Sequence, residues 1–448
     1  MQAADGLRNA PARLPASSGA GRTAPAVRSC RECGQAQRLP ALAPGAAAHC
    51  RRCGALLRHA WSDPLALALA LNLACLVLFA AGAATTLAAV DAEGRSRAAG
   101  LFSGPAALAQ NGLWELGVLV FATTVAAPPA VAGLTVYVLG GLRLRRPPPG
   151  LAFAFRLRNR LRPWSMIEVF LVGCFVAFAK LGALVHVEPG PAFFALFGFM
   201  ATTIAADVVL DPQAVWEAIG RRNASRFAGA NAAHFAGAPE GAARPARSPT
   251  PGLLCCPACD LACEAPGGPT PGRCPRCAAV LHRRKPDSVA RTAALALAAL
   301  VFYVPANAFP VLTVIRLERG SPSTILGGVW ELLAARQWSL AAIVFGASVA
   351  VPVLKILGLG AMLSLALRRQ PAHCLRHATA LYRVIAAVGR WSMIDIFMEA
   401  LLSALVQFGG IATVTTNPGA LAFAATVVLT ILAAESFDPR LMWDAAAR

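Results

Sequence analysis

Long apolar runs separated by polar segments make up most of this chain. The eight runs cover residues 64–90, 112–142, 167–187, 191–210, 289–315, 338–367, 394–414 and 418–434. An α-helix rises about 1.5 Å per residue, so helices of this length can cross a hydrocarbon core about 30 Å thick. We therefore expect an all-α polytopic membrane protein with eight transmembrane helices.

The same short motif opens the third and the seventh runs. Residues 164–168 read Trp-Ser-Met-Ile-Glu, and residues 391–395, which lie 227 positions later, read Trp-Ser-Met-Ile-Asp. Asp-Pro pairs at 211–212 and 438–439 keep the same offset. Two matched signals at one offset indicate a duplicated module, with four predicted spans in each half.

Prolines interrupt three of the runs. Pro128 and Pro129 lie in the second run, Pro305 in the fifth and Pro352 in the sixth. Proline lacks the backbone N–H and its ring clashes with the preceding helical turn, so we expect a kink at Pro128-Pro129. Pro352 follows Pro128 by 224 positions, which is close to the offset of the repeat.

Cysteine pairs precede each set of four runs. Eight of the thirteen cysteines form four Cys-x-x-Cys pairs: Cys30, Cys33, Cys50, Cys53, Cys256, Cys259, Cys274 and Cys277. Each pair places two thiolates on one tight turn, and two pairs complete a tetrahedral site of four sulfurs. Sixteen residues separate the first two pairs and fourteen the second two, close to the spacing of structural zinc sites. We expect two zinc ions with four cysteine ligands each.

Other states of these cysteines stay open. Disulfides, unmetallated thiols or a rubredoxin-like iron would fit the same spacing. Glycine follows both pairs of the first set, at Gly34 and Gly54, but neither pair of the second. Cys255 is a spare thiol that could replace Cys256 only by giving up the two-residue spacing.

Composition and charge agree with a membrane protein. The 448 residues are 57% hydrophobic and 14% charged, with a mean hydropathy of +0.57. Soluble domains carry about 25% charged residues. A formal net charge of +19 can reflect binding to nucleic acid, binding to anionic lipid, or the positive-inside bias of membrane loops. The location of the arginines distinguishes these three explanations.

Arginines concentrate between the second and third runs of each half, with seven in one segment and five in the other. The positive-inside rule places both segments in the cytoplasm, and with eight spans it also places both termini and both cysteine modules there. A reducing cytoplasm disfavours disulfides and so favours metal. Because topology accounts for most of the arginine excess, we expect no nucleic-acid partner.

These features divide the chain into six segments. They are a disordered tail at 1–27, zinc ribbon 1 at 28–60, membrane module 1 at 61–217, a linker at 218–252, zinc ribbon 2 at 253–285 and membrane module 2 at 286–444. The tail and the linker are rich in Ala, Gly, Pro and Arg without periodicity. No cleavable signal peptide is expected, because the first apolar run begins behind the first cysteine module.

Polar side chains within the apolar runs are candidates for a transport path, because an ionisable group in a span is costly and usually faces protein or water. The candidates are Lys355, Glu168, Asp395, Lys180, Asn307, Glu399 and Thr415. Simpler roles stay open for several of them. Glu168 and Asp395 would also suit helix N-termini, Lys180 could snorkel to the membrane surface, and Thr415 could end a helix.

Tryptophans repeat with the motifs, and we expect them to anchor the membrane interfaces. The matched pairs are Trp114 with Trp330, Trp164 with Trp391, and Trp216 with Trp443. Motifs of common enzymes, such as the phosphate-binding P-loop, G-x-S-x-G and H-E-x-x-H, are missing from the sequence. We therefore expect a protein that is not an enzyme and that draws energy from the proton motive force or from a partner.

Several motifs together resemble a known family. They are the two cysteine modules, each followed by four runs, the Pro-Ala-Asn at 305–307, the Trp-Ser-Met-Ile motifs and Asp-Pro-Arg-Leu-Met-Trp-Asp at 438–444. They cover about residues 28–217 and 253–444 and resemble the paraquat-inducible protein A family. The resemblance implies the inner membrane of a bacterium with two membranes, membrane lipids as cargo and zinc-ribbon-like cytoplasmic modules. It also implies a periplasmic tunnel partner built of MCE domains.

We therefore expect an inner-membrane component of an intermembrane lipid transport system, which hands lipid to or from the MCE tunnel and supports envelope integrity. Our mechanistic hypothesis is a path between the halves, in which Lys355 attracts a phosphate head group or joins a proton relay with an acid such as Glu168. Val131 takes the place of Lys355 in the first half, so the polar chemistry is expected to lean toward the second. Alternative functions are a membrane redox or thiol-sensing protein and a structural anchor for a periplasmic partner.

Overall fold

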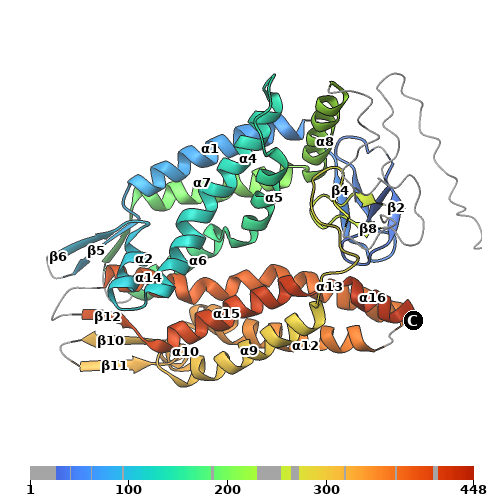
Figure 1. Ribbon diagram of the computed structural model, residues 1–448. Helices are drawn as coiled ribbons and strands as arrows, with labels where there is room; N and C mark the ends of the chain where they lie inside the picture. Colours follow the sequence, from blue (N-terminus) through green and yellow to red (C-terminus); the bar gives the residue numbers. More distant parts are fainter. Residues whose placement is uncertain are drawn as a thin grey trace, which may run out of the picture.

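The computed structural model describes residues 27–40, 42–61, 63–92, 95–182, 186–229, 254–263, 272–316, 319–368, 371–406 and 412–447. Two helical halves lie side by side, with β-sheets at one end and the cysteine modules at the other (Figure 1). The first half is drawn in blue to green and the second in yellow to red.

The two halves contain the same elements in the same order. The first half runs α1 (Pro64–Ala84), β5 (Ala88–Ala92), β6 (Arg95–Ala99), α2 (Ser103–Gln110), α3 (Trp114–Val120), η1 (Phe121–Ala126), α4 (Ala127–Arg143), α5 (Leu151–Leu161), η2 (Arg162–Trp164), α6 (Ile167–Gly182), β7 (His186–Pro189), α7 (Pro191–Val209) and α8 (Pro212–Gly229). The second runs α9 (Ser288–Ala308), β10 (Leu312–Arg316), β11 (Arg319–Ser323), α10 (Ile325–Ala334), α11 (Trp338–Phe345), η4 (Gly346–Ala350), α12 (Val351–Leu367), α13 (Ala372–Val388), η5 (Gly389–Met393), α14 (Ile394–Leu405), β12 (Ala412–Thr416), α15 (Pro418–Ser436) and α16 (Arg440–Ala447). The predicted duplication is confirmed.

Seven helices in the described part of the chain are long and apolar enough to cross a membrane. They are Pro64–Ala84, Trp114–Arg143, Leu151–Gly182, Pro191–Val209, Ser288–Ala308, Trp338–Leu367 and Pro418–Ser436. The helix at the seventh predicted span, α14, is described over 12 residues, which corresponds to about 18 Å at the α-helical rise. Its length alone does not match a 30 Å hydrocarbon core.

Four of the predicted spans were too long, because their last residues form strands rather than helix. The runs 64–90, 167–187, 289–315 and 394–414 end in β5, β7, β10 and β12, respectively. These strands belong to two equivalent antiparallel sheets, ordered β6-β5-β7 and β11-β10-β12. Apolar strand residues continue an apolar helix without a break in hydropathy, and so the sequence pattern did not separate them.

The sheets also correct the role predicted for Thr415. This residue lies in β12 opposite Thr313 of β10, so it does not end a transmembrane helix. The side chain of the nearby Asn417 donates a hydrogen bond of 2.6 Å to Thr313 Oγ1. Thr415 therefore belongs to the sheet at the end of the second half.

A π-helical turn precedes the proline in each long second helix of a half. The turn η1 ends one residue before Ala127-Pro128, and η4 ends just before Val351-Pro352. A wider turn relieves the clash between the proline ring and the preceding carbonyl groups. A π-turn therefore precedes the prolines at which a kink is predicted, and the second half repeats this turn.

Two segments assigned to loop or linker contain helices. The arginine-rich segments include the helices α5 and α13, and helix α8 continues through the first residues of the predicted linker at 218–252. The helix α5 buries Leu151, Ala154 and Phe155 on one face, whereas Phe153 is exposed. Amphipathic helices of this kind balance a low overall hydropathy with one buried face.

The helices opened by the two Trp-Ser-Met-Ile motifs, α6 and α14, pack against each other where the halves meet. Phe170 and Phe397 occupy equivalent positions in the repeat, and their ring centroids lie 5.9 Å apart with an edge-to-face angle of 76°. A Cβ atom added at Gly173 would lie 3.0 Å from Phe397 Cβ and 3.1 Å from the Ile394 carbonyl oxygen. The helices that follow the repeated motif therefore form a close contact between the two halves.

Candidate functional site

The first cysteine cluster joins two short hairpins. Cys30 and Cys33 follow β1 (Val27–Ser29), which pairs with β2 (Ala36–Arg38), and the other two ligand candidates lie between β3 (Ala47–His49) and β4 (Leu56–His59). The Sγ atoms of Cys30 and Cys53 are 3.5 Å apart, as are those of the other cross pair. The glycine after each pair has a φ near +74°, a left-handed conformation that favours glycine.

The second cluster repeats this geometry without the glycines. Its Sγ atoms lie 3.4 Å apart between Cys256 and Cys277 and 3.5 Å apart between the other two cysteines. Asp260 and Ala278 follow the two pairs, with φ of +56° and +58°. Both N–H groups donate to the carbonyl oxygen of the first cysteine of the pair, as Gly34 does in the first cluster. The second cluster therefore keeps the same turn, although its two residues other than glycine adopt a left-handed backbone conformation that such residues rarely adopt.

Each set of four thiols fits a tetrahedral cation. All ligand atoms of a set lie within 4.8 Å of one another, and all eight cysteines are buried. A Zn–S bond of about 2.3 Å in a tetrahedron places the sulfurs about 3.8 Å apart, close to the observed separations. Sulfur atoms bonded as a disulfide would lie only about 2.05 Å apart. The structure thus brings the eight predicted ligands together in two clusters that could each hold a metal ion.

The thiols of the first cluster strongly affect one another's ionisation. A hydrogen bond with Cys33 lowers the pKa of Cys30 to about 5, and the same contact holds the pKa of Cys33 well above its usual range. Burial raises the pKa of Cys53 to about 12. Four buried thiolates cannot persist beside one another without a positive charge, which a divalent cation would supply.

The cysteine modules cross over between the membrane halves. The first cluster packs into a core with Met362, Phe437 and Trp443 of the second half, whereas the second cluster packs with Phe155 and Trp216 of the first half. Trp216 and Trp443 are therefore buried beneath the modules, and their predicted role as membrane-interface anchors was wrong. Each cysteine cluster therefore packs against the half that it does not precede in the chain, while its module also pairs with the half that follows, through Arg58–Asp211 and Arg284–Asp444.

Polar contacts reinforce this crossing. Glu32 accepts hydrogen bonds from Arg383 of α13, and the guanidinium of Arg52 lies 4.5 Å from the ring centroid of Trp443. Arg31 forms an ion pair with Asp260 of the second module. The two modules therefore contact each other and also link the two halves.

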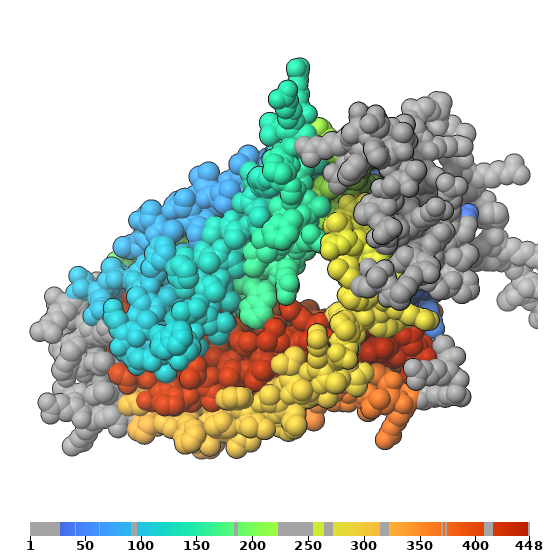
Figure 2. Space-filling view, viewed as in Figure 1, coloured from blue at the N-terminus to red at the C-terminus, as the bar shows by residue number. Residues whose placement is uncertain are grey.

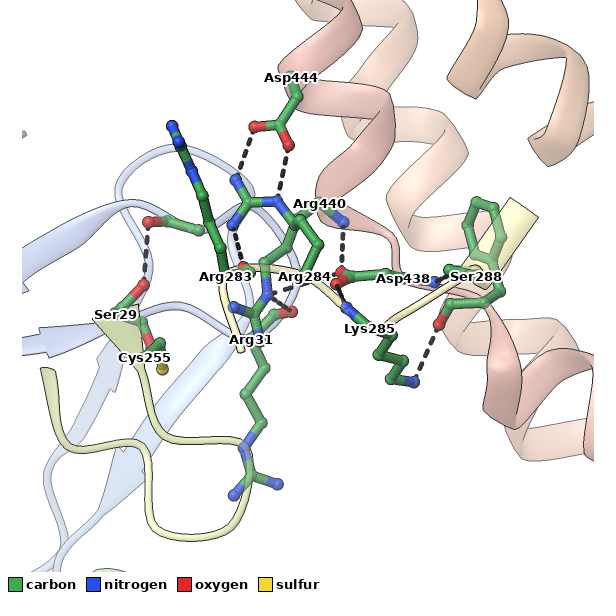
Figure 3. Close-up of polar contacts among 12 residues, drawn as sticks. Ser29, Arg31, Cys255, Arg283, Arg284, Lys285, Ser288, Asp438, Arg440 and Asp444 are labelled. Carbon is green, nitrogen blue, oxygen red and sulfur yellow. Dashed lines mark hydrogen bonds and ion pairs between the residues drawn. The ribbon is translucent and has the colours of Figure 1, made fainter. Parts of the chain in front are cut away.

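The Asp-Pro motif at 438–439 anchors the chain segment that enters the second half. Asp438 is 2% exposed and accepts hydrogen bonds from the backbone N–H groups of Lys285 and Arg440, at 3.2 and 3.1 Å (Figure 3). Asp444 of the following helix, α16, accepts two hydrogen bonds from Arg284, at 2.6 and 2.7 Å. The repeat motif therefore has a structural role, which the sequence pattern alone did not reveal.

The acidic transport-path candidates on α14 lie in a fully buried polar stripe. Asp395 and Glu399 share one face of the helix with Ser392 before them and Ser403 after them. Within the described chain, one polar atom of each of these four side chains has no hydrogen-bond partner. Lys180 acts electrostatically on both carboxyl groups. This stripe runs along the helix at the contact between the halves.

The remaining candidates are dispersed. Glu168 lies 3.6 Å from Arg162, and Asn307 donates to the carbonyl oxygen of Tyr303 one turn earlier in its own helix. Lys355 is 2% exposed, and its ammonium donates to the carbonyl oxygen of Gly389 at 3.1 Å. The structure therefore places Asp395 and Glu399 together on α14, with Lys180 on the adjoining helix α6, and places Lys355 elsewhere, beside the cavity described next.

A cavity of about 490 Å³ lies between the halves next to Lys355. Helix α13 and helix α15 form one side, and Arg158 and Arg162 come from the other half. Both arginines are paired with Asp207 of α7. Sequence reasoning used these arginines only as topology signals and overlooked Asp207, although an acid inside an apolar run was a usable sign of a buried partner.

The fold and its sites define a duplicated helical membrane protein, with two four-cysteine clusters tied across its halves. A family model, Paraquat-inducible protein A, matches residues 65–220 and 289–447, which are the two membrane halves. The chain belongs to this family. The family prediction made from the sequence motifs is therefore confirmed.

Two relatives from Escherichia coli K12 match almost the whole chain. The intermembrane transport protein PqiA is 31% identical over 420 residues, which cover 93% of this chain and 95% of the relative. The lipophilic envelope-spanning tunnel protein A is 31% identical over 420 residues, with 93% and 91% covered. A probable intermembrane transport protein of Haemophilus influenzae is 32% identical over 170 residues, which cover 38% and 41%. No solved structure was found to match the chain significantly.

Proposed function

We propose that this protein is the inner-membrane component of an intermembrane lipid transport system. The names of its relatives support transport between membranes, and the seven long apolar helices support a location in the membrane. The lipid would pass to or from a periplasmic tunnel protein built of MCE domains. The names of the relatives also favour this function over a redox or thiol-sensing protein.

The proposed topology has eight spans, in which α14 completes a seventh, shortened span between the halves. Both termini and both cysteine modules then lie in the cytoplasm, and the two sheets lie on the periplasmic side. We propose that each module is a zinc ribbon that holds one zinc ion with its four cysteines, and that the ribbons and the membrane modules are separate domains. Zinc would fix the fold of each ribbon. The crossing contacts would then keep the two halves in one arrangement.

The buried polar stripe on α14 is the observation that carries the transport mechanism. Unpaired polar atoms inside a membrane protein are costly and mark paths for protons or polar substrates. We propose that Asp395 and Glu399 bind and release protons beside Lys180, and that this movement is coupled to lipid passage. We propose that Lys355, Glu168 and Asn307 act at other, separate points of the path.

Transfer of fluorescent phospholipid from vesicles that contain this chain, through its tunnel partner, to acceptor vesicles tests the proposal. Glu399→Gln keeps the size of the side chain but removes its proton chemistry, and we expect transfer to slow at least tenfold. The matched control is Glu331→Gln, on the exposed side of α10. Equal transfer rates for the two variants at equal protein levels would contradict the role of the stripe.

A further inference from the structure

The cavity between the halves is lined by equivalent positions of the internal repeat. The offset of 227 that relates Trp164 to Trp391 also relates Arg158 to Ile385, Arg162 to Gly389 and Asp207 to Ala434. All six of these last-named residues line the cavity. In the space-filling view an opening lies between the green wall of the first half, the red helices of the second half and the yellow second cysteine module (Figure 2). Equivalent positions of the two halves therefore face one another across this space.

The lining is rich in positive charge. Arg158, Arg162, Lys355 and Arg390 line the cavity with only two acids, Asp207 and Glu435, which leaves a formal excess of two positive charges. Asp207 pairs with both Arg158 and Arg162, so it neutralises one of the two. Lys355 donates to a neutral carbonyl oxygen instead of a carboxylate.

A buried donor at the cavity has no partner. Arg162 Nη1 is buried, and within the described residues no acceptor lies in hydrogen-bond reach. A buried charged donor without a partner is unfavourable, because its hydration is lost without compensation. An anion in the cavity would balance the excess positive charge of the lining.

The two halves have diverged in complementary ways around this space. The first half supplies arginine where the second has Ile385 and Gly389, and the second supplies Lys355 where the first has Val131. A Cβ atom at Gly389 would lie 3.3 Å from Lys355 Cε, so a side chain at this position would crowd the lysine and glycine does not. Cations therefore reach the cavity from both walls without crowding each other.

We propose that this cavity is a binding site for a phosphate group. Guanidinium and ammonium groups supply charge-assisted donors that phosphate oxygens prefer, and a volume of 490 Å³ is within the range of ligand pockets. Apolar residues such as Ile385 and Ile431 lie beside the cations, and they could contact the part of a lipid head group that is next to the acyl chains. The assignment of a lipid as the ligand depends on the proposed transport function. Binding of a phosphate group to this cavity does not depend on it.

Binding to the full-length chain in detergent tests this site. The probes are water-soluble dihexanoyl phosphatidylglycerol and inorganic phosphate, each followed by direct titration and by the rise in unfolding temperature. We expect Arg162→Gln and Lys355→Met each to weaken binding about tenfold or more, because each removes one charge-assisted contact. The matched control is Arg145→Gln, which removes an exposed arginine outside the cavity and keeps wild-type affinity.

The outcomes separate the two sources of phosphate. Binding of the lipid but not of inorganic phosphate supports a head-group site, and competition between the two supports a site for free phosphate as well. Equal affinity in Arg162→Gln, Lys355→Met and Arg145→Gln, or no binding of either probe to the folded wild type, overturns the proposal. The Glu399→Gln transfer assay fails or succeeds independently of this result, because that residue does not line the cavity.

Discussion

Gly173 offers a quantitative test of how the halves are joined. In the Gly173→Ala variant the new methyl group would lie 3.0 Å from Phe397 Cβ, 3.1 Å from the Ile394 carbonyl oxygen and 3.3 Å from the Met398 amide nitrogen. Two of these atoms belong to the backbone of α14, so rotation of a side chain cannot relieve the contact. Overpacking of this kind costs about 1–3 kcal/mol, and the gain in helix propensity from glycine to alanine recovers at most about 1 kcal/mol.

Reversible unfolding of the purified chain in mixed detergent micelles measures this effect. We expect Gly173→Ala to lower the free energy of unfolding by about 1–2 kcal/mol. Gly140→Ala is the matched control, because it lies inside α4 and no atom outside its own helix turn lies within 4 Å of the new methyl group. A Gly173→Ala variant as stable as the control would show that α6 and α14 do not pack closely.

Three further perturbations test the end of the molecule that carries the cysteine modules. Metal analysis of the purified chain is expected to give about two zinc ions per chain, one fewer in Cys30→Ser and no change in Cys75→Ser, whereas iron and a visible colour would support the redox alternative. Asp438→Ala removes the acceptor of two backbone N–H groups, so we expect it to lower the free energy of unfolding by about 1–3 kcal/mol. Asp444→Asn, at a more exposed site, is expected to change the free energy of unfolding by less than about 1 kcal/mol. Similar losses in the two variants would contradict the structural role of Asp438. Glu32→Gln weakens the half-exposed pair with Arg383, so a loss above about 1 kcal/mol in the same measurement would be unexpected.

Sequence patterns predicted the membrane architecture well where one physical signal dominated. Hydropathy located the helices, and the offset of 227 located the repeat, since both follow from local composition. The ends of the spans were wrong at residues 88–90 and 312–315, because strands at the end of an apolar helix are as hydrophobic as the helix itself. Only the pairing between distant strands identifies them, and a single sequence does not contain this information.

The cysteine ligands were predictable and the remaining site residues only partly so. A Cys-x-x-Cys spacing fixes two ligands within one turn, whereas the contacts of Asp207 with Arg158 join residues 49 positions apart. The buried polar stripe was half visible, because the helical spacing of Asp395 and Glu399 predicts a shared face. The crossing of the cysteine modules depends on the packing of both halves, and no local pattern indicates it.

Lipid transfer by Lys355→Ala is the most direct test of transport through the space between the halves. The lysine is buried and lines the cavity. The equivalent position of the first half is the uncharged Val131. We expect Lys355→Ala to reduce phospholipid transfer at least tenfold, while Val131→Ala at the equivalent position transfers lipid at close to the wild-type rate. Unchanged transfer by Lys355→Ala at normal protein levels would contradict a transport path at this position.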